Sequence, residues 1–128
     1  MKRDQSYELI FWHQGAMMAQ SSRSIYESLL AQNPVKGLSE LPIESIVSRV
    51  VTSFPAAIRD GDREPETVEW RSDNGEDSFT MTWSPHHVRV ECRQLALEHV
   101  TNLVDIAASF SCPLYDPQSG RRFRLTEP

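Results

Sequence analysis

Three consecutive stretches in the second half of the chain alternate apolar and polar residues, and this pattern constrains the fold more than any other feature. They span residues 67–71, 78–83 and 88–92. A period of two places successive side chains on opposite faces of a strand, so each stretch predicts a β-strand with one buried and one solvated face. Asn74-Gly75 lies between the first two, and this dipeptide is a strong hairpin signal because both residues tolerate positive φ. The sequence therefore predicts an antiparallel meander.

The first half of the chain predicts one strand and two helices. Residues 7–12 are aromatic and β-branched on both faces, which is typical of a strand at the centre of a sheet. Residues 16–31 have helical periodicity. Residues 43–54 carry apolar side chains at i, i+3, i+4, i+7, i+8 and i+11, which form one continuous helix face, and Pro55 ends this helix.

The C-terminal part predicts a third helix over residues 94–110, whose buried face consists of Val100, Leu103, Val104 and Ala107. A short strand over residues 112–115 follows, and then a turn that begins with Asp116-Pro117. Residues 121–125 are a candidate edge strand, because their charges suit the edge of a sheet.

The expected order of elements is βααβββαβ, with the candidate edge strand at the end. This order predicts an α+β fold in which an antiparallel sheet has its helices packed on one apolar face. The chain has 128 residues and a mass of 14.6 kDa, which fits one domain over residues 1–128. No apolar run approaches the roughly 20 residues of a membrane span, and no signal peptide is recognisable, so we expect a cytoplasmic protein that does not bind membranes.

Acidic side chains are concentrated in one segment. Residues 59–77 hold eight acids and three arginines, an excess of five that equals the whole net charge of −5. Such a segment repels phosphate backbones, so we expect no nucleic-acid partner. It is either a solvated loop that favours solubility or a surface that attracts a basic protein. The acids are Asp60, Asp62, Glu64, Glu66, Glu69, Asp73, Glu76 and Asp77.

Sequence patterns for cofactors and metals were sought and not found. The five glycines are scattered, and the chain has no glycine-rich phosphate loop, no Cys-x-x-Cys and no His-Glu-x-x-His. His86-His87 with Cys92 could supply metal ligands, but adjacent residues in a turn point apart. We expect no cofactor and no metal. The three tryptophans are expected in the core or on a sheet face.

The cysteines are the remaining candidates for reactive chemistry. Cys92 and Cys112 lie in apolar contexts, and the simplest expectation is that both are reduced and buried. Cys92 also precedes the third predicted helix, a position that can lower the pKa of a thiol. A small enzyme that pairs either cysteine with His13 or His99 is therefore an alternative.

The two ends of the chain carry a resemblance. The segment Tyr7-Glu8-Leu9-Ile10-Phe11-Trp12 is followed by a helix with Ile25-Tyr26, and an apolar helix precedes Leu114-Tyr115-Asp116-Pro117-Gln118-Ser119-Gly120. Together they resemble a broad group of small bacterial proteins, some of which look like the immunity proteins encoded beside polymorphic toxins, as in type VI secretion or contact-dependent inhibition. The resemblance spans most of the chain in layout but rests on about fifteen residues.

The resemblance implies a non-enzymatic inhibitor that binds one cognate toxin and blocks its active site or substrate access. Under this hypothesis the eight acidic residues are the partner-binding residues, because an acidic surface complements a basic substrate cleft and speeds association. The alternative is a housekeeping or interaction domain without a toxin partner, which could form a homodimer through an exposed strand edge.

Overall fold

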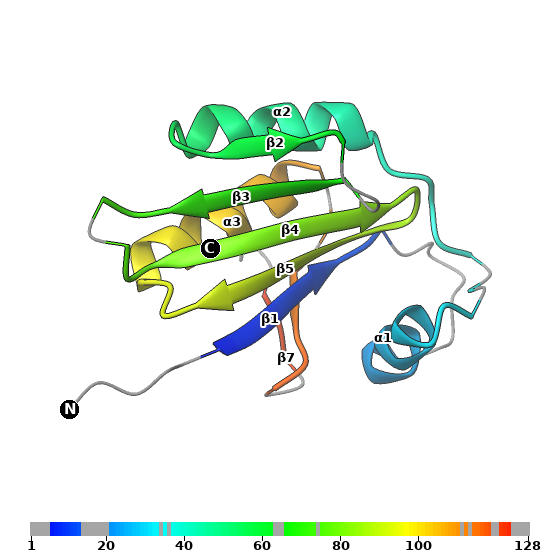
Figure 1. Cartoon of the computed structure of the whole chain (residues 1–128). Coiled ribbons are helices and arrows are strands. Elements are labelled where there is room, and N and C mark those ends of the chain that lie inside the picture. The colour runs from blue at the N-terminus through cyan, green and yellow to red at the C-terminus, as the bar shows by residue number, and fades with distance from the viewer. Residues whose placement is uncertain are drawn as a thin grey trace.

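The computed structural model describes residues 6–13, 21–33, 35, 37–62, 66–73, 75–110, 112, 114–118 and 121–123. These residues form one sheet and three helices (Figure 1). The strands are β1 (Ser6–Phe11), β2 (Ile58–Asp60), β3 (Thr67–Arg71), β4 (Ser78–Ser84), β5 (His87–Arg93), β6 (Leu114–Asp116) and β7 (Arg121–Phe123). The helices are α1 (Ser22–Leu30), α2 (Ile43–Ser53) and α3 (Leu97–Ser109).

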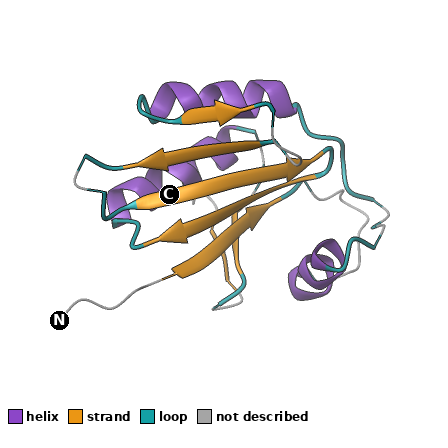
Figure 2. Ribbon diagram, viewed as in Figure 1, coloured by secondary structure: helices purple, strands orange, loops and turns teal. Residues whose placement is uncertain are grey.

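The sheet is antiparallel throughout the described residues and has the strand order β2-β3-β4-β5-β1-β6-β7 (Figure 2). The predicted meander is present as β3, β4 and β5. The first strand of the chain, β1, pairs with β5 on one side and with β6 on the other, so its predicted central position is confirmed. The α+β class is also as predicted.

The sheet has helices on both faces, whereas the sequence predicted helices on one. Alternate residues of β1, and Trp12 directly after it, explain the difference. Leu9 and Phe11 belong to the larger core with α2 and α3, while Ile10 and Trp12 belong to a smaller core that Ile25 of α1 completes. The one-face expectation therefore holds for α2 and α3 and is wrong for α1.

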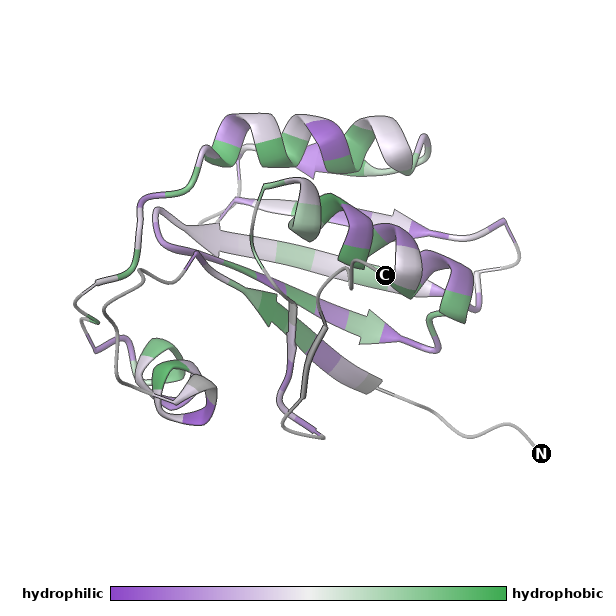
Figure 3. Ribbon diagram, turned by 180° about the vertical axis from the view of Figure 1, so that it is seen from behind, coloured by the Kyte–Doolittle hydropathy of each residue, from purple (hydrophilic) through white to green (hydrophobic). Residues whose placement is uncertain are grey.

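The larger core lies between the meander and two neighbouring helices. α2 contributes Ile46, Val47 and Val50, as its periodicity predicted. The apolar sides of both helices face the sheet (Figure 3). In α3 the buried residues are Leu103, Ile106 and Ala107, whereas Val100 and Val104 pack at the margin of the core.

Several boundaries differ from those predicted. The acidic segment was expected to begin as loop, but Ile58–Asp60 forms β2 along β3. α1 begins at Ser22, where the Ser21 hydroxyl accepts the backbone N–H of Ser24 (3.1 Å) and caps the helix; residues 16–20 of the predicted helix lie outside the described residues.

The predicted Asn-Gly hairpin and the predicted edge strand are each found in part. The backbone N–H of Ser72 donates to the carbonyl of Asp77 across the loop between β3 and β4. Gly75 has a φ of +75°, as the hairpin signal required. Asn74 lies outside the described residues. The candidate edge strand is confirmed over Arg121–Phe123, which pairs with β6 at the end of the sheet.

Candidate functional site

The acidic residues predicted as one binding surface occupy both ends of β3. Five extended residues separate those ends by roughly 17 Å. Glu69 lies between them, on the face of the sheet opposite α2 and α3, because it alternates with the core residues Val68 and Trp70. The groups are Asp60, Asp62 and Glu66 at the β2–β3 end and Asp73, Glu76 and Asp77 at the β3–β4 end; Glu64 lies outside the described residues.

Arginine compensates part of the acidic charge at the β2–β3 end. The Arg59 guanidinium donates from Nη1 and Nη2 to the two carboxylate oxygens of Glu44 (2.8 and 2.9 Å), and it also pairs with Glu66. These hydrogen bonds lower the pKa of the Glu44 carboxyl. Asp60 accepts the backbone N–H of Asp62 (3.0 Å), which holds the turn after β2.

The β3–β4 end adjoins the start of α3. The Asp77 carboxylate accepts the backbone N–H of Ala96 (3.0 Å), the residue that precedes this helix. The first turn of α3 therefore lies beside the hairpin, and together they border an open cavity of about 610 Å³. We call it the hairpin cavity; it is lined by Pro55, Ala56, Trp70, Arg71, Ser72, Asp73, Asp77, Glu98 and His99.

The hairpin cavity combines carboxylates with aromatic rings. Its lining holds three carboxylates and one arginine. The His99 ring lies 4.7 Å from the Trp70 ring between centroids, and its Nε2 lies 3.9 Å from the Asp77 carboxylate and 3.7 Å from that of Glu98. Carboxylates attract a cation, so this arrangement can receive a lysine or arginine side chain.

Two residues that line the hairpin cavity were not predicted from the sequence as part of a binding surface. Glu98 was not singled out, and His99 was considered only as a partner for a cysteine. Both lie more than 20 residues along the chain from Asp73 and Asp77. No local pattern marks this proximity, which results from the turn between β5 and α3.

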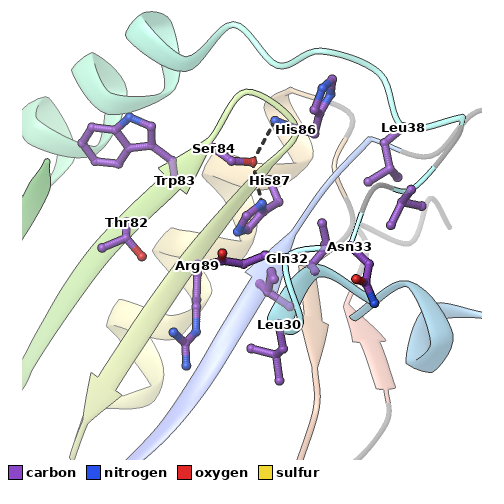
Figure 4. A pocket seen from close by; sticks show the side chains of 13 residues that line it. Leu30, Gln32, Asn33, Leu38, Thr82, Trp83, Ser84, His86, His87 and Arg89 are labelled. Carbon is purple, nitrogen blue, oxygen red and sulfur yellow. Dashed lines mark hydrogen bonds between the residues drawn. The ribbon is translucent and has the colours of Figure 1, made fainter. Parts of the chain in front are cut away.

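A second cavity of about 610 Å³ lies between α1 and the sheet face that α2 and α3 leave open (Figure 4). We call it the α1 cleft. One wall is apolar and comes from α1 and the segment after it: Leu29, Leu30, Val35 and Leu38. The opposite wall is the sheet, which contributes Thr82, Ser84, His87 and Arg89. This cleft was not predicted from the sequence, because α1 was expected on the same face of the sheet as α2 and α3.

The turn between β4 and β5 orders the polar end of the α1 cleft. The Ser84 hydroxyl accepts the backbone N–H of His86 (3.1 Å), and its oxygen lies 2.6 Å from Nδ1 of His87 (Figure 4). Burial lowers the pKa of His87, and the charge of Arg89 lowers it further. The imidazole is therefore held in its neutral form.

The cysteines are enclosed in the protein. Cys92 and Cys112 are both buried, free thiols in the larger core. Burial raises the pKa of Cys92 to about 12. A thiol becomes a nucleophile as its thiolate, so this environment disfavours reaction at Cys92. Cys92 and His87 also lie on opposite faces of β5, because an odd number of positions separates them.

Comparisons with known proteins provide no family for this chain: no family model matches it, and no curated protein does. Within the described part of the chain, no three His, Cys, Asp or Glu side chains gather as a metal ion would require. The same residues include no helix with the length and apolar character needed to cross a membrane.

Proposed function

We propose that this chain is an immunity-type protein that binds a basic protein toxin and neutralises it without chemistry of its own. The hairpin cavity supports this proposal most directly. It offers a recess bounded by the carboxylates of Asp73, Asp77 and Glu98, with Trp70 in its wall. Interfaces are commonly dominated by a few residues seated in such recesses, and arginine is frequent among them.

The proposal assigns different roles to the acidic residues. Those at the β3–β4 end and Glu98 contact the partner, with a lysine or arginine of the toxin inserted into the hairpin cavity. Those at the β2–β3 end contribute to long-range attraction, because Arg59 already pairs with acidic residues there. Charge of this kind mainly accelerates encounter, whereas the inserted side chain lengthens the lifetime of the complex.

The test uses the secreted toxin domain that this proposal expects to be encoded beside this chain, in a catalytically inactive form. Association and dissociation rates would be measured for the unchanged protein and for the double variant Asp73→Lys/Glu98→Lys. We expect this variant to slow association by about tenfold at low salt and to shorten the lifetime of the complex. Asp77 is left unchanged, because its carboxylate holds the start of α3.

A matched control is the double variant Asp62→Lys/Glu64→Lys in the acidic segment that precedes β3; Asp60 is left unchanged, because its carboxylate holds the turn after β2. It makes the same change in net charge, so we expect slower association but an unchanged dissociation rate. Equal dissociation rates for both double variants would contradict the assigned contact site. Absence of any complex with the neighbouring toxin domain, together with self-association in gel filtration, would instead favour the homodimer alternative.

A further inference from the structure

We propose that the α1 cleft binds an uncharged small molecule that has an apolar body and a hydrogen-bond-accepting carbonyl group, such as an amide. This inference is separate from toxin binding, because the cleft and the hairpin cavity share no lining residue. The volume of about 610 Å³ falls among those of ordinary small-molecule sites, which are about 300–1,000 Å³.

The apolar body of the ligand follows from one wall of the cleft. Leu29 and Leu30 come from the last turn of α1, and Val35 and Leu38 from the segment that returns to the sheet. Leu30 is 47% exposed, although large apolar side chains are ordinarily buried. A ligand with an aliphatic or aromatic body would remove this surface from water.

The absence of charge follows from the opposite wall. Arg89 is the only residue with a full charge among the described residues that line the cleft. Its Nε donates to Glu8 (2.6 Å) and its Nη1 lies 3.1 Å from the Glu91 carboxylate. Two carboxylates thus compensate one guanidinium. An anionic ligand would meet no excess of positive charge. A cationic ligand would contact Arg89 itself, because Arg89 is in the lining of the cleft and Glu8 and Glu91 are not.

The carbonyl follows from the hydrogen-bonding groups of the polar end. Ser84 Oγ accepts from the backbone N–H of His86 and lies 2.6 Å from Nδ1 of His87. A neutral imidazole has one donor and one acceptor nitrogen, so His87 can form a hydrogen bond with either the N–H or the carbonyl side of an amide. Gln32 and Asn33 add amide groups from the turn that follows α1, where Gln32 has a φ of +58°. The cleft is thus supplied with donors for an accepting oxygen.

The test compares two probes with the same apolar body, octanamide and octanoate. Both would be titrated into the full chain while NMR follows the methyl groups of Leu29, Leu30 and Leu38 and the ring of His87. We expect octanamide to shift these signals saturably and to bind about tenfold more tightly than octanoate, because octanoate adds a third carboxylate beside Glu8 and Glu91.

Two leucine variants locate the site. Leu30→Gln makes the apolar wall polar at a partly exposed helical position, and we expect it to weaken octanamide binding about fivefold. Leu97→Gln is the matched control, since Leu97 is 78% exposed and does not line the cleft. His87→Phe keeps a ring but removes its hydrogen-bonding nitrogens, so it should weaken octanamide binding and leave the preference for the amide over the carboxylate, which depends on Glu8 and Glu91, in place.

Three results would overturn the proposal. The first is no shift of the cleft signals by octanamide up to its solubility limit. The second is octanoate binding as tightly as octanamide, which would refute the charge argument. The third is an equal loss of affinity in Leu30→Gln and Leu97→Gln, which would place the probe elsewhere. Leu30→Gln lies at the surface, so the test does not depend on the folding of His87→Phe.

Discussion

His86 and His87 are neighbours in the chain, yet only the second is drawn into the protein. His86 is exposed, whereas His87 is partly buried beside Ser84, its partner across the β4–β5 hairpin. Because adjacent residues in a turn point apart, the sequence predicted no common role for them as metal ligands. The strand explains the difference, because His87 is the first residue of β5 and its side chain is directed toward the open face of the sheet.

The burial of His87 predicts a pH dependence of stability. Its pKa is lower in the folded protein than in the unfolded chain, so the unfolded chain binds more protons as the pH falls. The contribution of neutral His87 is therefore complete above its unfolded pKa of about 6.5 and is lost as the pH drops toward the folded value.

The variant His87→Gln should remove this dependence. We expect the difference in melting temperature between the unchanged protein and His87→Gln to fall steadily from about pH 7.5 to about pH 5. Thermal unfolding over this range measures it. His86→Gln is the control, since His86 is exposed and no such trend is expected. Parallel pH curves for the unchanged protein and His87→Gln would contradict the prediction.

At the scale of the element, periodicity predicted α2 and failed for β2. α2 is eleven residues long and repeats its apolar positions three times, so Ile46, Val47 and Val50 could be placed in the core in advance. β2 has three residues, too few for a period of two to be recognised. It is a strand because β3 provides its hydrogen-bonding partners. These partners lie outside the segment, so the three residues of β2 by themselves do not indicate them.

The difference between α2 and β2 predicts that the same substitution, isoleucine to alanine, lowers the free energy of unfolding by very different amounts in the two elements. Ile46 in α2 is fully buried, whereas Ile58 in β2 is 69% exposed. Ile46→Ala should lower the free energy of unfolding by about 2–5 kcal/mol, because it leaves a cavity in the larger core. Ile58→Ala should change it by less than about 0.5 kcal/mol. Denaturant unfolding of both variants checks this, and similar costs would show that β2 is buried in solution.

At the scale of the whole molecule, the sheet separates two cores of unequal size. The larger one includes residues from α2, α3 and four strands. The smaller one consists of Ile10, Trp12, Ile25 and Tyr115, with partly buried side chains around it. Tyr26 adds a hydrogen bond from its hydroxyl to the Glu8 carboxylate. α1 is therefore held by the fewest buried apolar groups, and it forms one wall of the α1 cleft.

This inequality predicts that α1 opens separately from the rest of the fold. Ile25→Ala should accelerate hydrogen exchange of the α1 amides by about 30-fold, which corresponds to a loss of about 2 kcal/mol, and should leave α2 and α3 unchanged. Hydrogen exchange followed by mass spectrometry measures it. Ile106→Ala in the larger core is the control, and should accelerate exchange in α3. Uniform acceleration by Ile25→Ala would show that both cores unfold together.

Local sequence patterns determined the α+β class, the central position of β1, the meander, the core face of α2 and the edge strand. Each depends on the spacing of side chains within one element or on the chemistry of one turn. Tertiary structure decided the side of the sheet that α1 covers, the pairing of β2, and the separation of the acids to two ends of β3. It also brought Glu98 and His99 to Asp73 and Asp77, and α1 to His87. These arrangements depend on free energies of contact between residues far apart in the chain, which no single stretch encodes.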